Sequence, residues 1–379
     1  MQKKSKVKKV IVVFGTRPEV IKMAPVIREL QKYPKIFKVS ICVTAQHREM
    51  LDEMLNLFKI KPDYDLNIME NNQSPFEVTA KVLMNIREVL ECQCPDIVLV
   101  QGDTTTTLAT SLASFYLKIK IGHIEAGLRT TDKYKPFPEE INRRLTSHLA
   151  DFHFVPTQKA KENLLTEGIK KDNIFLTGNT VIDALFYILK FIKKSKKKLD
   201  ERFCFLNLKK NKLILVTAHR RENFGKPLEN ICLALKQLVE RNKNIEIIYP
   251  VHPNPNVWGV VRKILKDITR IYLIKPLDYI SFAYLLHNSH LVLTDSGGIQ
   301  EEAPSLGKPV LVMREKTERP EAIEASAARL VGTDTVNIVK NVEMLLYNRK
   351  IYIKMSKATN PFGDGKASRR IVRILKNVV

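Results

Sequence analysis

The residues Asp96-Ile97-Val98-Leu99-Val100-Gln101-Gly102-Asp103 indicate how this chain folds. Their continuous apolar run predicts a β-strand that is covered on both faces, as in a parallel sheet. Similar short apolar runs alternate with longer helical patterns through the first half of the chain. The predicted strands of this half are Val10–Phe14, Val39–Thr44, Asp96–Val100, Ile119–Ile124, Phe152–Val155 and Ile174–Leu176.

The same alternation begins again after a lysine-rich connector. The connector runs from Lys190 to Lys212 and has neither aromatic stacking platforms nor groove-reading motifs, so we interpret it as a solvated helix end. The strands predicted after it are Leu213–Thr217, Ile245–Pro250, Ile271–Ile274, Leu291–Thr294, Pro309–Met313 and Arg329–Val331. We therefore predict an α/β protein with two doubly wound parallel-sheet domains and a cleft between them.

Composition narrows the classes of protein to which the chain can belong. Its 379 residues are 44% hydrophobic and 27% charged, which excludes disordered and fibrous classes. The net charge of +23 alone leaves a nucleic-acid partner open. Five scattered cysteines without CxxC spacing argue against a disulfide framework and a structural zinc site. With no signal-peptide pattern and no apolar stretch of about 18 residues, we expect a cytoplasmic protein without membrane insertion.

Ligands of doubly wound sheets bind beyond the carboxyl ends of the strands, so polar residues that follow strands are the candidate site residues. After the first strand, Gly15 stands alone where a dinucleotide-binding turn needs three glycines. We therefore expect no NAD here. Arg17 and Lys22, at the start of the next helix, suit a phosphate or a carboxylate, with a surface pair as the alternative.

Three carboxylates form a second group of candidates. Asp103 and Glu125 each follow a predicted strand, and Glu139 opens a helix after a proline-rich loop. Strand ends direct the first two toward one site, and the loop can bring Glu139 over it. Crowding drives the pKa values of carboxylates apart, as acid and base roles at one site require. Helix capping is the alternative for Asp103, and we expect Glu140 to pair with an arginine or the helix dipole.

The second half supplies groups that suit a nucleotide. His219 stands beside two arginines on a loop that ends in glycine, which is typical of an anion-binding element, with an exposed surface loop as the alternative. The segment Asp295-Ser296-Gly297-Gly298 follows a strand and presents backbone N–H groups to a phosphate at a helix start. Glu302, one turn later, is placed to accept two hydrogen bonds from a vicinal diol such as a ribose. Arg319 supplies a further cation.

Together these segments resemble the non-hydrolysing bacterial UDP-N-acetylglucosamine 2-epimerases. The matching segments, in order, are Phe14 to Glu19, Thr44 to Arg48, Gly102 to Thr107, His123 to Thr130, Pro136 to Glu140, His219 to Asn223, Asp295 to Ser305 and Asn360 to Gly365. The resemblance implies a GT-B fold with two Rossmann-like domains and a C-terminal helix that crosses back to the first. It assigns residues 1–177 and 364–379 to the first domain and residues 178–363 to the second.

The resemblance also implies a reaction and roles for individual residues. The reaction is the reversible conversion of UDP-GlcNAc to UDP-ManNAc, which supplies ManNAc for cell-surface polysaccharide, by a homodimer without cofactor or metal. Asp103, Glu125 and Glu139 resemble the acid/base carboxylates, and His219 a catalytic or phosphate-side group. The implied nucleotide contacts are Arg17, Lys22, Phe282, Ser296, Gly297, Gly298, Glu302 and Arg319. A regulatory site for a second, activating UDP-GlcNAc is implied at Gln46, Arg221 and His252.

The chemistry favours elimination over a redox route. Inverting carbon 2 of the sugar requires either oxidation of a neighbouring carbon with NAD or expulsion of UDP from carbon 1 while the carbon 2 proton leaves. Because the dinucleotide-binding turn is missing, we expect anti elimination to 2-acetamidoglucal and re-addition of UDP. A GT-B glycosyltransferase, a hydrolysing epimerase and a basic nucleic-acid-binding protein remain as alternatives.

Overall fold

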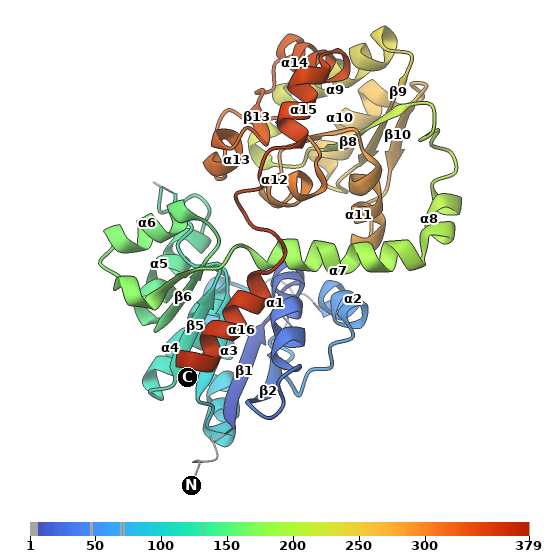
Figure 1. Ribbon diagram of the computed structural model, residues 1–379. Coiled ribbons are helices and arrows are strands. Elements are labelled where there is room, and N and C mark those ends of the chain that lie inside the picture. The colour runs from blue at the N-terminus through green and yellow to red at the C-terminus, as the bar shows by residue number, and fades with distance from the viewer. Residues whose placement is uncertain (1–6, 46–47, 69, 71–72, 131, 379) are drawn as a thin grey trace. The chain divides into compact units, whose positions relative to one another are not determined.

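The computed structural model describes residues 7–45, 48–68, 70, 73–130 and 132–378. The chain divides into two compact units, unit 1 (Met1–Ala184 with Phe362–Val379) and unit 2 (Leu185–Pro361), each with its own parallel sheet (Figure 1). In the described part of the chain, no helix has the length and apolar character needed to cross a bilayer.

The sheet of unit 1 has the strand order β3-β2-β1-β4-β5-β6-β7, and every pair in it is parallel. The strands are β1 (Lys8–Phe14), β2 (Phe37–Val43), β3 (Tyr64–Asp65), β4 (Ile97–Gln101), β5 (Lys120–Ile124), β6 (Phe152–Val155) and β7 (Ile174–Leu176). All five residues of β4 are buried, which confirms a strand covered on both faces. The short edge strand β3 was not predicted.

The helices of unit 1 cover this sheet. They are α1 (Arg17–Leu30), α2 (Arg48–Phe58), α3 (Pro75–Gln93), α4 (Thr105–Tyr116), α5 (Glu139–Leu149), α6 (Gln158–Thr166) and α16 (Ala367–Val378), with a short turn η1 (Lys171–Asn173). α16 packs against α1 through buried Ile371, Val372 and Leu375, so the end of the chain belongs to unit 1 (Figure 1). α7 (Thr180–Lys194) begins in unit 1 and ends in unit 2.

Unit 2 repeats the design with the parallel order β10-β9-β8-β11-β12-β13. Its strands are β8 (Lys212–Thr217), β9 (Ile245–Pro250), β10 (Ile271–Ile274), β11 (Leu291–Thr294), β12 (Val310–Val312) and β13 (Ala328–Leu330). Its helices and short turns are α8 (Lys196–Arg202), η2 (Arg221–Asn223), α9 (Lys226–Arg241), α10 (Pro255–Leu265), α11 (Tyr279–Asn288), α12 (Gly297–Glu302), η3 (Ala303–Leu306), α13 (Pro320–Glu324), α14 (Thr335–Tyr347) and α15 (Arg349–Ser356). The lysine-rich connector contains the end of α7 and the whole of α8, so the predicted helix end is present.

Both sheets have a point where the strand order reverses. In unit 1 this switch point lies between β1 and β4, and in unit 2 it lies between β8 and β11. Loops at the carboxyl ends of such strands diverge to opposite faces of the sheet and leave a crevice that ligands occupy. The fold therefore concentrates binding capacity at the loops after these four strands.

Candidate active site

The switch-point loops carry the residues that the sequence singled out. In unit 1, Arg17 lies at the start of α1 after β1, and Asp103 lies in the loop after β4. In unit 2, His219 follows β8 and the segment from Asp295 to Gly298 follows β11.

Glu125 is the anchor of the site in unit 1. It adopts a left-handed backbone conformation with φ of 62° and is buried. Lys22 Nζ lies 2.5 and 2.6 Å from its two carboxylate oxygens. The amides of Gln101 and Asn179 donate to the same carboxylate, the latter at 3.0 Å. These charged and neutral donors hold Glu125 in one orientation and compensate its buried charge.

Asp103 lies on the neighbouring loop, which is joined to that of Glu125. The Gly102 N–H donates to the Ile124 carbonyl at 2.9 Å, and a Cβ at Gly102 would lie 3.7 Å from Glu125 Oε2. Arg143 Nη2 lies 2.6 Å from Asp103 Oδ2. The capping alternative fails, because Thr104 and not Asp103 caps α4.

Burial raises the pKa of Asp103 above its ordinary value, Arg143 lowers it, and the negative charges of Glu125 and Glu139 add to the rise. Glu125 and Glu139 therefore act electrostatically on Asp103.

Glu139 is the first residue of α5 and lies one turn before the residues that hold the Asp103 loop. Asn142 Nδ2 donates to the Asp103 carbonyl at 3.0 Å, so α5 is fixed to that loop. Glu139 Oε2 is buried and has no hydrogen-bond partner among the described residues. Glu140 pairs with Arg144 at 2.8 Å, as expected for a helix residue with a structural role.

A small cavity of about 240 Å³ opens beside Glu139. Its lining combines hydroxyl and amide side chains with prolines: Thr16, Gln73, Pro75, Val78, Thr104, Thr105, Pro138, Glu139 and Asn142. The buried oxygen of Glu139 that has no hydrogen-bond partner among the described residues thus belongs to a residue of this cavity, and a ligand hydroxyl or amide would satisfy it.

The β1–α1 loop is fixed by Glu19, which sequence reasoning missed. Glu19 accepts hydrogen bonds from the N–H groups of Gly15 and Thr16 at 3.0 and 2.8 Å, and from Thr104 Oγ1 at 2.8 Å. Burial raises its pKa above the ordinary value. This buried carboxylate joins the loop before Arg17 to the loop of Asp103.

In unit 2, Ser296, Gly297 and Gly298 form the start of α12, as predicted. A Cβ at Gly297 would lie 3.5 Å from Glu318 Oε2, 3.7 Å from Arg220 Nη2 and 3.9 Å from Arg319 Cζ, so two guanidinium groups and the carboxylate that pairs with Arg220 flank this turn. Arg319 is oriented by an ion pair with buried Glu301. Bare backbone next to two arginines is well suited to a diphosphate.

Glu302 is buried near the end of α12 and is not an exposed helix residue. Its Oε1 accepts a hydrogen bond from the Tyr279 hydroxyl at 2.6 Å. Tyr279 is the first residue of α11, the helix that also carries half-buried Phe282. The tyrosine orients a carboxylate that is the candidate for binding a ribose.

His219 and His252 lie together on the loops after β8 and β9. Their rings stack with centroids 5.8 Å apart and an angle of 16° between planes. Burial lowers the pKa of His219, with smaller decreases from His252 and Arg220, whereas Asp295 raises it. Arg221 is exposed in η2. Gln46, the remaining predicted regulatory residue, lies outside the described residues.

Other residues of the site were not predicted, although the same strand-end rule applies to some of them. Gln101 ends β4 and Asn179 follows β7, so their positions alone were informative. The partner of Lys22 is 103 residues away in the chain, so the sequence around Lys22 gave no signal for it.

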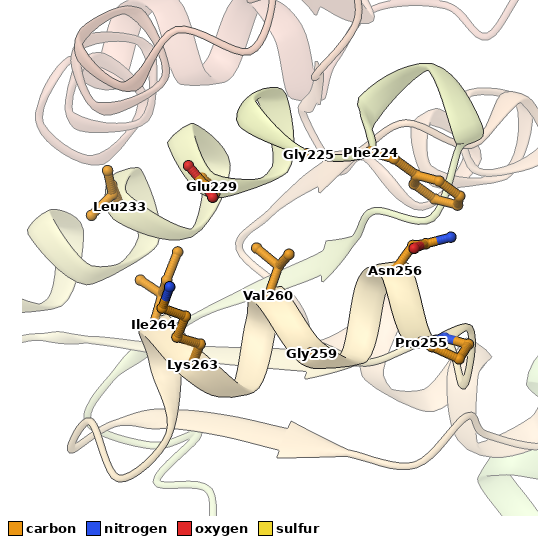
Figure 2. A pocket seen from close by; sticks show the side chains of 10 residues that line it. All are labelled: Phe224, Gly225, Glu229, Leu233, Pro255, Asn256, Gly259, Val260, Lys263 and Ile264. Carbon is orange, nitrogen blue, oxygen red and sulfur yellow. The ribbon is translucent and has the colours of Figure 1, made fainter.

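A further groove of about 520 Å³ lies between α9 and α10 and is lined by residues such as Phe224, Leu233 and Ile264 (Figure 2). It contains none of the predicted site residues.

Known proteins with this arrangement identify the family. The family model described as UDP-N-acetylglucosamine 2-epimerase matches residues 28–376. A Salmonella typhimurium protein named UDP-N-acetylglucosamine 2-epimerase is 55% identical over 97% of this chain and 98% of its own length. The chain belongs to the UDP-N-acetylglucosamine 2-epimerase family.

Solved structures of the family agree with this assignment. The UDP-GlcNAc 2-epimerase from Neisseria meningitidis, bound to UDP-GlcNAc, is 52% identical with a TM-score of 0.90, covering 97% of this chain and 99% of that one. The Methanocaldococcus jannaschii UDP-GlcNAc 2-epimerase, in complex with UDP-GlcNAc and UDP, is 38% identical with a TM-score of 0.79, at 97% and 99% coverage. The predicted GT-B class, with two Rossmann-like sheets in one chain, is confirmed.

Proposed function

We propose that this chain interconverts UDP-GlcNAc and UDP-ManNAc by eliminating and re-adding UDP, with Asp103, Glu125 and Glu139 as the proton-transfer groups. The observation that carries the proposal is the proximity of three carboxylates, two after neighbouring strands and Glu139 at the start of a helix that Asn142 joins to the Asp103 loop, with the charges of Glu125 and Glu139 adding to the rise that burial causes in the pKa of Asp103. A raised pKa brings a carboxyl group closer to neutrality, where it exchanges protons most effectively.

The reaction needs no net oxidation. A carboxylate takes the proton from carbon 2, and the electron pair of that C–H bond forms a double bond between carbons 1 and 2. The bond from carbon 1 to the UDP oxygen breaks, and its electron pair leaves with UDP. In the return step the UDP oxygen attacks carbon 1 while an acid delivers a proton to the opposite face of carbon 2.

Each carboxylate has a different environment for this work. Glu125 is fixed by Lys22 and two amides, Asp103 is paired with Arg143, and Glu139 has an oxygen without a hydrogen-bond partner among the described residues. These different partners give each carboxylate a distinct setting, which supports separate acid and base roles.

Leaving-group stabilisation is the proposed task of the cations. UDP must stay bound while the sugar is in the form of 2-acetamidoglucal, and hydrogen-bond donors around the diphosphate would hold it. Arg319 and the start of α12 with Ser296, Gly297 and Gly298 supply such donors in unit 2, and Arg17 is the corresponding group in unit 1. Glu302, oriented by Tyr279, is the proposed ribose contact, and Phe282 on the same helix is the proposed apolar contact.

Near-isosteric variants test the proposal. Asp103→Asn, Glu125→Gln and Glu139→Gln are each expected to lower turnover by at least about 10²-fold, because proton-transfer groups contribute about 10²–10⁴-fold. A variant impaired mainly in the return step releases UDP and 2-acetamidoglucal. Glu162→Gln, on the exposed face of α6, is the matched control and retains parental turnover.

The products separate this proposal from its alternatives. Free ManNAc and UDP as the end products of the unmodified protein indicate a hydrolysing epimerase. Transfer of the sugar to an acceptor without epimerisation indicates a glycosyltransferase. Near-parental turnover in any of the three carboxylate variants removes that residue from the mechanism.

We also propose that the chain forms a homodimer through the outer surface of α3, α4 and α5. These neighbouring helices expose large apolar side chains, including Phe76 at 86%, Phe115 at 55% and Tyr116 at 65%. Such a concentration is typical of an interface between protein chains. Phe115→Glu is expected to yield monomers in analytical ultracentrifugation, while Val336→Glu, at a more exposed site in unit 2, leaves the dimer intact.

The proposal also includes a regulatory site and a cellular compartment for the protein. Arg221 and His252, with Gln46, are the proposed contacts of an activating second UDP-GlcNAc, and the exposure of Arg221 and His252 supports this role. The test is to measure the rate of conversion of UDP-ManNAc to UDP-GlcNAc as UDP-GlcNAc is added. Activation predicts that this rate depends sigmoidally on the added UDP-GlcNAc. The proposed compartment is the cytoplasm, supported by five free cysteines, of which Cys92, Cys94 and Cys204 are exposed.

A further inference from the structure

Asp295 is a buried carboxylate at the switch point of unit 2, with a fractional exposure of 0%. One of its oxygens, Oδ2, accepts three hydrogen bonds from the β8–α9 loop. The donors are the N–H groups of His219 and Arg220 at 2.7 and 2.8 Å, and Asn223 Nδ2 at 3.1 Å. Oδ2 therefore fixes the backbone that carries His219.

The second oxygen of Asp295 has a different environment. Oδ1 is buried and has no hydrogen-bond partner in the described part of the chain, yet it lies 3.4 Å from His219 Nδ1. Catalytic hydrogen bonds of this kind are often long in the absence of substrate and shorten when it binds. A buried carboxylate oxygen without another donor strongly favours a proton on the nitrogen that faces it.

We propose that Asp295 is a positioning residue that holds His219 in the tautomer with the proton on Nδ1. The nitrogen that exchanges a proton with the ligand is then Nε2, on the opposite edge of the ring. The inference rests on the proposed function, because it assigns His219 a role at the diphosphate. Charged His219 then donates its Nε2 proton to the UDP oxygen as the bond to carbon 1 breaks, and the neutral ring takes that proton back through Nε2 when UDP returns to carbon 1. This is the geometric logic of carboxylate and imidazole pairs in hydrolases.

His252 provides an internal comparison for this assignment. Its Nδ1 accepts a hydrogen bond from the Asn254 N–H at 3.2 Å, so neutral His252 carries its proton on Nε2. The two stacked rings consequently have opposite tautomers. His252 presents an N–H donor at Nε2, while His219 presents a lone pair there.

The carboxylate at position 295 goes beyond what the loop requires. A single amide oxygen is sufficient to accept the three donors that Oδ2 now accepts. An amide in place of the carboxylate must direct its oxygen at those donors, because the reverse orientation opposes N–H groups to N–H groups. Its NH₂ group then faces His219 Nδ1, which must accept, and the proton of the neutral ring moves to Nε2.

Asp295→Asn therefore tests the tautomer while preserving the loop. In ¹⁵N-labelled protein above the pKa of His219, NMR is expected to show a protonated Nδ1 in the parent and a protonated Nε2 in the variant. Turnover is expected to fall about 10²-fold, with KM changed by less than about threefold. His219→Gln is expected to be similarly impaired, and the double variant no worse than the more impaired single variant, because the two residues act as a unit.

The outcomes are distinguishable. A parent protein with the proton on His219 Nε2, or an Asp295→Asn variant with turnover within about twofold of the parent, overturns the proposal. Asn223→Ala removes one donor to Oδ2 without touching the imidazole, and it is expected to leave the His219 tautomer unchanged. If the parent shows the Nδ1 tautomer but does not epimerise UDP-GlcNAc, the proposed function fails and the assignment of the tautomer stands.

Discussion

The ion pair of Lys22 and Glu125 allows structural and catalytic roles to be measured separately. Their side chains are only 17% and 5% exposed, and Lys22 Nζ lies within 2.6 Å of both carboxylate oxygens. Removing one member of a buried pair leaves an uncompensated charge and costs about 3–5 kcal/mol. Because Gln101 and Asn179 still donate to Glu125, we expect Lys22→Met to cost about 3 kcal/mol, at the lower end of that range.

Urea unfolding measures this loss of stability in Lys22→Met. With an m-value of about 2 kcal/mol/M, a loss of about 3 kcal/mol lowers the midpoint for unit 1 by about 1.5 M. The single tryptophan, Trp258, lies in unit 2, so its fluorescence reports the unfolding of unit 2 and serves as an internal control. We expect the circular dichroism transition of unit 1 to shift and the fluorescence transition to stay.

The double variant Lys22→Met with Glu125→Gln shows whether the loss of stability in Lys22→Met is caused by the uncompensated charge of Glu125. It removes both charges, so stability is expected to return to within about 1 kcal/mol of the parent. Epimerisation is expected to remain lost, because the proposed proton-transfer group is missing. A double variant as unstable as Lys22→Met alone would refute the electrostatic explanation, and one that is active would refute the catalytic role of Glu125.

Two further predictions concern the titration of unit 1 and the nucleotide half. Burial lowers the pKa of His123 to about 4 and that of His153 to about 3, so the unfolded chain takes up protons first as the pH falls below about 6.5. Each histidine is therefore expected to lower the free energy of unfolding by about 2 kcal/mol between pH 8 and pH 5, and His123→Gln should remove its share of that slope in urea titrations. Glu302→Ala is expected to weaken UDP binding by about 1.5–3 kcal/mol in calorimetry, and unchanged affinity would show that Glu302 is only a helix residue. Tyr279→Phe, which removes one hydrogen bond to Glu302, should have a smaller effect.

The sequence predicted the sheets because the information for a buried strand is local. The apolar run from Ile97 to Val100 has no polar interruption, and the structure buries each of its residues. The edge strand Tyr64–Asp65 was missed because two residues cannot display a period of two. The strand-end rule also found Asp103 and Glu125, because a parallel sheet places the carboxyl ends of neighbouring strands at one edge.

The partners of these residues were beyond local reasoning. Lys22 was expected to bind a phosphate or a carboxylate, and only the tertiary fold shows that Glu125 is its partner. Arg143 follows Glu139 by one turn, yet its pairing with Asp103 depends on how α5 docks. Asp295 was recognised as part of a phosphate-binding turn, while its contacts with the β8–α9 loop require the two strands to be neighbours.

In the proposed reaction, carbon 2 of the sugar is inverted by loss and return of its proton, without oxidation. The most direct measurement is incubation of the purified protein with UDP-GlcNAc in D₂O, without added NAD or metal, followed by proton NMR of both epimers. We predict that UDP-GlcNAc and UDP-ManNAc reach equilibrium and that one solvent deuteron enters carbon 2. Retention of the original carbon 2 proton in UDP-ManNAc, or a requirement for NAD, would contradict it.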